Sequence, residues 1–183
     1  MKRQSSREIL VASFHELMKE KPADKITIQE IVENCGYSPA TFYRQFRDKY
    51  DLIAWDYSTQ CSAIMGQIGR DGNTWETSVR EACRYFERER GYLCNLLAHT
   101  SGQDSFFRYM STANVDLLCR EVARKLGKDD IPEELRVSIL VFGYGTAQLI
   151  CEWLTGLHPY SADQLTALLT GALPEMLTPY LRD

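Results

Sequence analysis

The sequence predicts an all-α protein, in which a small three-helix domain is followed by a larger helical domain, with about nine helices in total. Apolar residues recur at helical spacing along most of the chain, and Ser, Thr or Asp precedes several of these stretches where a helix cap would lie. A hydrophobic content of 44% with 25% charged residues is sufficient for a real core. We expect the first domain to cover residues 1–47 and the second 48–183.

The first helix is expected from about Ser5 to Lys21. Its apolar stripe comprises Ile9, Leu10, Phe14, Leu17 and Met18, and Pro22 stops it. We expect this helix to pack beneath the two short helices that follow.

Two short helices joined by a tight turn are predicted from the stretch TIQEIVENCGYSPATFYRQF. Thr27 and Glu30 have the spacing of a capping box, which satisfies two backbone N–H groups at a helix start. Gly36 falls just past the last turn, where a left-handed backbone costs glycine little. Ser38 can cap a second helix that starts at Pro39. Such a pair forms a helix-turn-helix.

The second of these helices has two distinct faces. At about 100° per residue, Phe42 and Phe46 share one face, which should pack inward. The opposite face and its flanks carry Ala40, Thr41, Tyr43 and Arg44. These residue types suit DNA, because Arg binds guanine or phosphate, Thr and Ala contact thymine methyl groups, and Tyr reaches backbone oxygens.

The formal net charge of −4 is distributed unevenly. Residues 1–55 carry nine Lys and Arg against eight Asp and Glu, whereas the remainder is clearly acidic. Basic residues lie at the start of the chain (Lys2, Arg3, Arg7) and around the second short helix (Arg44, Arg47, Lys49). We therefore expect one face of the molecule to attract phosphate and the rest to repel it.

The stretch TIQEIVENCGYSPATFYRQFRDKYDLI resembles the DNA-binding domain of the TetR family of bacterial regulators. The likeness lies in the Thr-Ile start, the Gly in the turn, the Thr-Phe-Tyr core of the second helix, and the positions of Phe46, Lys49 and Leu52. Carried over by position, the resemblance implies phosphate contacts for Thr27, Tyr43 and Lys49. It implies base reading by Ser38, Ala40, Thr41 and Arg44.

The remaining helices follow from caps and breakers. One long helix is expected from Asp48 toward Gly69, and a second begins after Thr74 and is interrupted at Gly91. Two further helices are expected at about Asp104–Leu126 and Glu133–Leu154, and Ser161 caps the last one. The last two are expected to form a four-helix dimer interface with a second copy, since Gly143, Gly145 and Ala147 permit close helix approach. The alternative is that they close the core of the monomer.

An effector site is expected among the aromatic residues of the second domain, because ligand pockets are mostly apolar. The candidate lining residues are Trp55, Trp75, Phe86, Phe107, Met110, Tyr144 and Trp153. An aromatic stripe at helical spacing can equally be plain core.

Other features limit the function. No apolar run approaches the 18 residues of a membrane span, and the first residues lack the apolar core of a signal peptide, so we expect a cytoplasmic protein. The six cysteines form no C-x-x-C pair and the three histidines are scattered, so no metal or cofactor is expected. No glycine-rich phosphate loop or nucleophile elbow points to an enzyme.

The expected function is a homodimeric repressor that binds a palindromic operator on double-stranded DNA and is released by a small-molecule effector. An alternative comes from Tyr92-Leu93, Phe106-Phe107 and the Trp153–Gly156 segment. These resemble a TetR subgroup that includes activators of dihydroxyacetone-kinase operons, and the resemblance implies control by a protein partner.

Overall fold

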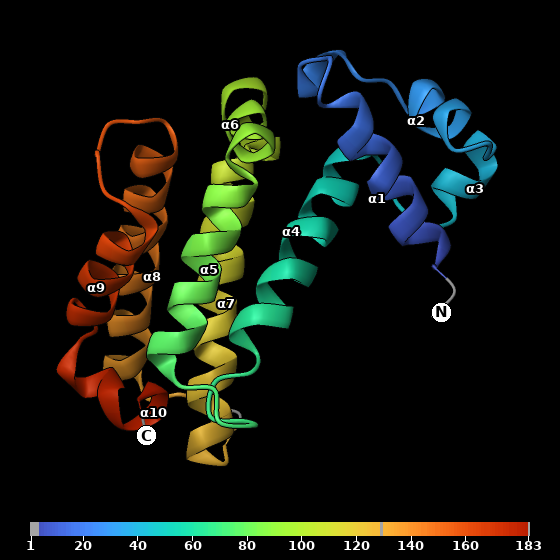
Figure 1. Ribbon diagram of the computed structural model, residues 1–183. Coiled ribbons are helices and arrows are strands. Elements are labelled where there is room, and N and C mark those ends of the chain that lie inside the picture. Colours follow the sequence, from blue (N-terminus) through green and yellow to red (C-terminus); the bar gives the residue numbers. More distant parts are fainter. Residues whose placement is uncertain (1–3, 129, 183) are drawn as a thin grey trace.

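The computed structural model describes residues 4–128 and 130–182, and every regular element in this part of the chain is a helix (Figure 1). The all-α prediction is confirmed. Lys2 and Arg3, expected as part of a basic start, lie outside the described residues. The described part contains ten α-helices, one more than expected, because a short helix α10 (Thr178–Leu181) follows the last predicted one.

Three helices form the N-terminal head of the molecule: α1 (Ser6–Leu17), α2 (Ile28–Asn34) and α3 (Pro39–Tyr43). A single 3-10 turn, η1 (Ala23–Lys25), connects α1 to α2. The predicted capping box of α2 is present, with Thr27 accepting from the Glu30 N–H and Glu30 accepting from the Thr27 N–H. The turn before α3 places Gly36 at a φ of 70°, a conformation that costs glycine little.

The head packs on α4 (Lys49–Met65), which continues out of it into the second domain (Figure 1). Asp48 caps α4 through bonds from the N–H groups of Tyr50 and Asp51. Leu52 and Ile53, in the first turns of α4, are almost fully buried. One rigid helix thus belongs to the core of the head and to that of the second domain. The division into 1–47 and 48–183 stays a prediction.

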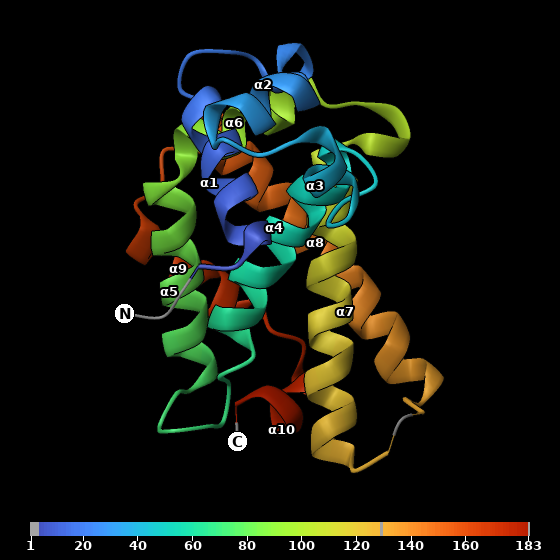
Figure 2. The same cartoon turned by 90° about the vertical axis from the view of Figure 1, so that its right-hand side faces the viewer.

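The second domain is a helical bundle. It consists of α5 (Trp75–Arg88), α6 (Arg90–His99), the 3-10 turn η2 (Gly102–Asp104), α7 (Phe106–Leu126), α8 (Glu133–Leu154), α9 (Ala162–Gly171), the 3-10 turn η3 (Glu175–Leu177) and α10. Helix α7 packs along both α8 and α4, and α5 packs along α9 (Figures 1 and 2). The break expected at Gly91 falls at Glu89 instead, where the backbone leaves helical geometry between α5 and α6.

Helices α7 and α8 approach each other closely at Gly143. A Cβ atom at this position would lie 2.8 Å from Cγ2 of Val115 on α7, which is closer than side chains tolerate. Ala147, one turn further along α8, is fully buried. Gly145, in contrast, is exposed and has no atom within 4 Å of an added Cβ. Two of the three small residues therefore serve the monomer's own core, and only Gly145 points outward.

The two glycines of α8 make a matched pair for testing this packing. We expect Gly143→Ala to lower the free energy of unfolding by roughly 1–3 kcal/mol, because the short, stiff Val115 side chain must move. Gly145→Ala should raise it by about 0.5–1 kcal/mol, since alanine is the better helix former and nothing obstructs it. Chemical denaturation of both variants checks this. Equal effects at the two positions would contradict the close α7–α8 contact.

Candidate nucleic-acid interface and interior cavity

The exposed face of α3 carries a connected polar group. Ser38 caps the helix, with its hydroxyl accepting from the Thr41 N–H at 3.3 Å. The two hydroxyls are 3.2 Å apart, and Thr41 Oγ1 accepts from Nη2 of Arg44 at 3.1 Å. Ala40, beside them, is exposed, as is Tyr43 at 59%. The structure thus brings the predicted base-reading residues together on one outward surface.

The opposite side of this segment is buried. Phe42 is fully buried and Phe46 is 2% exposed, with ring centroids 5.8 Å apart. Burial of two aromatic rings fixes the rotation of α3 about its axis, because turning the helix would expose both to water. Arg44 therefore points outward, and only one of the five N–H donors of its guanidinium is engaged in a hydrogen bond within the described part of the chain.

Two of the predicted phosphate contacts, Thr27 and Lys49, lie at the starts of α2 and α4. Thr27, at the start of α2, is exposed, and its hydroxyl is shared with Glu30. A hydrogen bond from Lys21, followed by those from Thr27, lowers the pKa of Glu30 to about 2. Lys21 also forms an ion pair with the Glu30 carboxylate. The negative charge of Glu30, beside the expected DNA backbone, is therefore compensated.

Lys49 has a second set of partners. Its Nζ donates to the carbonyl oxygens of Ala23 at 2.8 Å, Asp24 at 2.9 Å and Ile26 at 2.9 Å. Partial burial lowers the pKa of Lys49. Since an ammonium group has three donors, all are used to hold the η1 turn against the start of α4. The phosphate contact carried over from the family pattern stays a prediction, and contact would require the ammonium to share these bonds.

Arg7 and Arg47, two of the basic residues expected on the phosphate-attracting face, have different surroundings. Arg7 of α1 donates to the carbonyl oxygen of Gln45 at 3.2 Å and lies over the rings of Phe46 and Trp55. It therefore locks the end of the reading segment onto α1 and α4. Arg47 follows α3 and its side chain is 85% exposed, which makes it a further candidate for phosphate. The aromatic neighbours of Arg7 come from distant positions, which no local sequence pattern reveals.

Helix α6 links the head to the second domain through Asn95. Its Oδ1 accepts from the Ala23 N–H at 3.0 Å, and its Nδ2 donates to the carbonyls of Met18 at 3.2 Å and Lys21 at 2.9 Å. One amide thus bonds three backbone groups in the connection between α1 and α2. A shift of α6 would have to displace this connection or break the bonds.

A second link between the two parts is centred on Asp56 of α4, which is 3% exposed. Its Oδ2 accepts from Nε2 of His15 at 2.8 Å and from the hydroxyl of Tyr92 at 2.9 Å. The His15 and Tyr92 rings stack with centroids 3.9 Å apart. Burial, followed by the charge of Asp56, raises the pKa of Tyr92 well above its ordinary value, so its hydroxyl stays protonated and donates. Helices α1, α4 and α6 meet at this carboxylate.

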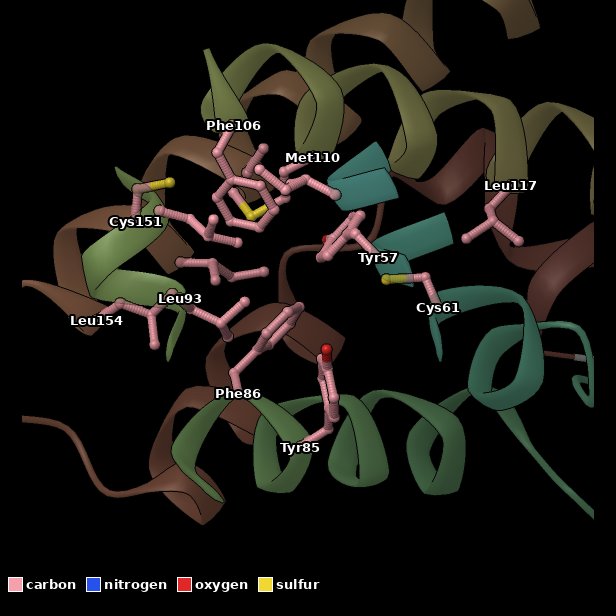
Figure 3. Packing of buried hydrophobic residues seen from close by; sticks show 14 of the residues in the cluster. Tyr57, Cys61, Tyr85, Phe86, Leu93, Phe106, Met110, Leu117, Cys151 and Leu154 are labelled. Atoms are coloured by element: carbon pink, nitrogen blue, oxygen red, sulfur yellow. The ribbon is translucent and has the colours of Figure 1, made fainter. Parts of the chain in front are cut away.

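The second domain contains a partly open cavity of about 70 Å³. Its walls come from α4, α5, α7, α8 and α9 and are mainly aliphatic and aromatic, including Cys61, Trp75, Tyr85, Phe86, Leu117 and Phe142. Figure 3 shows the packed core beside it, with Phe86 and Tyr85 of α5 directed toward Tyr57 of α4. Polar groups in the lining are few, and they include Asn114, Glu121 and Thr146. An apolar lining with a few polar groups is typical of a small-molecule site.

Of the seven residues predicted to bind an effector, Trp75 and Phe86 line this cavity. Met110 is fully buried in the adjacent core (Figure 3), and Trp153 is fully buried with its Nε1 donating to the Tyr160 carbonyl. Trp55 lies at the junction of the head and α4. Phe107 is half-buried outside the lining, and Tyr144 is 48% exposed on α8. Ligand contact by any of the seven stays a prediction.

No group of three or more His, Cys, Asp or Glu side chains suited to a metal ion occurs among the described residues. The six cysteines are free, and burial raises the pKa of five of them. These thiols are therefore weakly reactive at neutral pH.

Both parts of the chain match models of known protein families. Residues 10–54 match the family model described as bacterial regulatory proteins, tetR family. Residues 73–174, more than half of the chain, match the model described as transcriptional regulator C-terminal region.

Solved structures share the fold over nearly the whole chain. The dihydroxyacetone kinase operon activator DhaS has a TM-score of 0.68 at 14% identity, covering 96% of this chain and 98% of that one. A TetR transcriptional regulator from Streptococcus agalactiae 2603V has a TM-score of 0.61 at 20% identity, covering 97% and 94%. NalD, a secondary repressor of the MexAB-OprM multidrug efflux pump in Pseudomonas aeruginosa, has 0.53 at 16%, covering 97% and 96%. At these identities the likeness concerns the fold.

A capped helix-turn-helix with an exposed polar face, joined by one long helix to a larger helical domain, defines a DNA-binding transcriptional regulator. The two family models specify which kind: the chain belongs to the TetR family.

The bonds of Lys49 lead to a stability prediction. Lys49→Met should lower the free energy of unfolding by roughly 1–2 kcal/mol, because three carbonyl groups lose a charged donor. Arg47→Met removes a cation of similar position whose side chain is largely exposed, and it should change stability by no more than about 0.5 kcal/mol. Denaturant titration of both variants measures the difference. A Lys49 variant as stable as the parent would show that these bonds contribute nothing.

Proposed function

We propose that the protein is a homodimeric repressor that binds a palindromic operator and leaves it when a small molecule enters the cavity of the second domain. It acts in the cytoplasm, and regulation rather than catalysis is its role. The observation that carries the proposal is the outward face of α3, where Ser38, Thr41 and Arg44 form one hydrogen-bonded group on the helix that the family uses to read DNA.

Recognition follows from the geometry of this face. A helix enters the major groove, which is about 12 Å wide, when small side chains border the reading residues. Ala40 and Ser38 keep this part of α3 narrow, and the guanidinium of Arg44 has donors left for the two acceptors of a guanine. Thr27, Tyr43 and Lys49 are proposed to contact phosphate groups, which set the register without reading sequence.

Dimerisation through α8 and α9 is supported by exposed apolar side chains. Val137, Val141 and Tyr144 are 48%, 71% and 48% exposed, and their spacing places them on one face of α8. Leu168 of α9 is 47% exposed. Helix α8 has the length and apolar composition of a helix that could cross a membrane. Only 39% of its most apolar window is buried within the described chain, so much of this apolar helix is left uncovered. In a TetR regulator, a second copy is the partner that fits this face.

Release by a small molecule is supported by the position of the cavity. One wall consists of Cys61, Ile64 and Met65 on α4, the same helix that holds the head through Asp56. A ligand that binds better when α4 is displaced would shift the spacing of the two heads in a dimer, and DNA affinity would fall by population shift.

The alternative function is an activator controlled by a protein partner, of the dihydroxyacetone-kinase type. The structural match to DhaS, which covers nearly all of both chains, favours it. This function predicts that a protein binds the second domain stoichiometrically and that small molecules leave DNA affinity unchanged. Co-purification of the intact regulator with proteins encoded beside its gene, followed by DNA-binding measurements with and without effectors, separates the two functions.

Two arginines test the reading face. Arg44→Ala should relax base preference at one position of each half-site, with a loss of about 1–3 kcal/mol for the preferred sequence. Arg47→Ala, which removes an exposed cation outside α3, should weaken all sequences alike and reduce the salt dependence of binding. Selection of binding sequences from a random pool, followed by anisotropy titrations at several salt concentrations, measures both. Failure to select an inverted repeat would argue against the dimeric operator, and equal loss of preference in both variants would argue against reading by Arg44.

The proposed interface is tested by Val141→Glu, which places a charge on the most exposed apolar residue of α8. We expect it to produce monomers at concentrations where the parent is dimeric, since an unpaired charge buried at an interface costs several kcal/mol. Met176→Glu is the control, because Met176 is also exposed (46%) but lies outside α8 and α9. Sedimentation equilibrium gives the mass of each. A dimer that survives Val141→Glu would place the interface elsewhere.

A further inference from the structure

We propose that the cavity of the second domain accepts a small, neutral, largely apolar molecule with one hydrogen-bond acceptor, which the indole N–H of Trp75 binds. The inference rests on the proposed regulation by a small molecule and adds the chemical class of that molecule. The size of the cavity, an unpaired donor and the charge of the lining each contribute to it.

The size of the cavity limits the ligand. A single water molecule requires a cavity volume of about 10–15 Å³. The cavity of about 70 Å³ therefore holds roughly five to seven water-sized groups. A molecule with about that number of non-hydrogen atoms therefore matches the volume of the cavity. Drug-sized ligands occupy sites of about 300–1,000 Å³ and would require the surrounding helices to separate.

One buried donor of the lining lacks a partner. Trp75 is 3% exposed, and its Nε1 has no hydrogen-bond partner within the described part of the chain. Tyr85 also lines the cavity, and Figure 3 shows its hydroxyl directed away from α5 toward Tyr57 and Cys61. Burial raises the pKa of Tyr85, so this hydroxyl stays protonated. Unpaired buried donors are rare in folded proteins. An acceptor oxygen on a ligand would satisfy Trp75.

The charge of the lining excludes ionised ligands. Among the described residues that line the cavity, none is Lys, Arg or His. Glu121 is the acidic member, and its carboxylate already accepts from Nε of Arg124 at 2.7 Å. Burial raises the pKa of Cys61 to about 12 and also that of Cys83, so these thiols carry no charge. An anion would therefore meet the Glu121 carboxylate and no cationic side chain of the lining, and a cation would lose its hydration to apolar walls.

A series of six-membered rings separates these requirements. Cyclohexanone carries the acceptor, methylenecyclohexane has the same shape without it, and cyclohexanecarboxylate and cyclohexylammonium carry charge. We expect the intact protein to bind both neutral rings and neither ion, by calorimetry or ligand-observed NMR. Trp75→Phe should weaken cyclohexanone roughly threefold to tenfold, as loss of one hydrogen bond does, and should change methylenecyclohexane less than twofold.

A spectroscopic measurement makes the test independent of whether the variant folds. The chain has three tryptophans, and the indole N–H of Trp153 already donates to the Tyr160 carbonyl. In the unmodified protein, cyclohexanone should move the indole N–H resonance of Trp75 downfield, whereas methylenecyclohexane should not. Trp55→Phe assigns the remaining signal. A Trp75 resonance that responds equally to both rings, preference for an ion, or no binding of either neutral ring at millimolar concentration would overturn the proposal.

Operator binding is measured separately in the presence of cyclohexanone. If the ring binds and the Trp75 resonance shifts while DNA affinity stays constant, the ligand class is supported and release by a small molecule is contradicted. If cyclohexanone lowers DNA affinity without binding in the cavity, release by a small molecule is supported and the proposed ligand class is contradicted.

Discussion

The carboxylate of Asp56 is the point at which three helices depend on one another. A buried carboxylate is costly unless donors surround it, and here one donor comes from His15 on α1 and the other from Tyr92 on α6. Because Asp56 lies on α4, this group helps to hold the head and the second domain in one relative geometry. Asn95 adds bonds to the α1–α2 connection on the same side of the molecule.

The very short helix α3 is positioned by its contacts with the rest of the head. Helix α3 has five residues and could not persist alone in water. Its stability comes from Phe42 and Phe46, which are buried against the head, and from Arg7, which holds the carbonyl of Gln45. The exposed residues of α3, which we propose to face DNA, carry almost none of this packing. They can therefore vary between regulators while the scaffold stays the same.

Local patterns predicted most of the fold. The caps Thr27, Ser38, Asp48, Thr74 and Ser161 all lie where expected, since a cap depends on residues within one helical turn. The orientation of α3 was also predictable from the spacing of its two phenylalanines. In contrast, the contacts of Trp55 with Arg7, of Trp153 with Arg90 and of Lys49 with Ala23 join segments that are far apart in the sequence. An aromatic residue at helical spacing indicates burial, but whether it borders an empty space depends on how the helices assemble.

The contact between Gly143 and Val115 has a consequence for motion. Because the space beside Gly143 is already filled by Val115, we expect α7 and α8 to resist movement relative to each other. These helices form a stationary frame, and α8 also carries the exposed apolar face. Any molecule that enlarges the cavity must then push against its other walls. We expect such displacement to be directed into α4 and α5, and a tilt of α4 would tilt the head that packs on it.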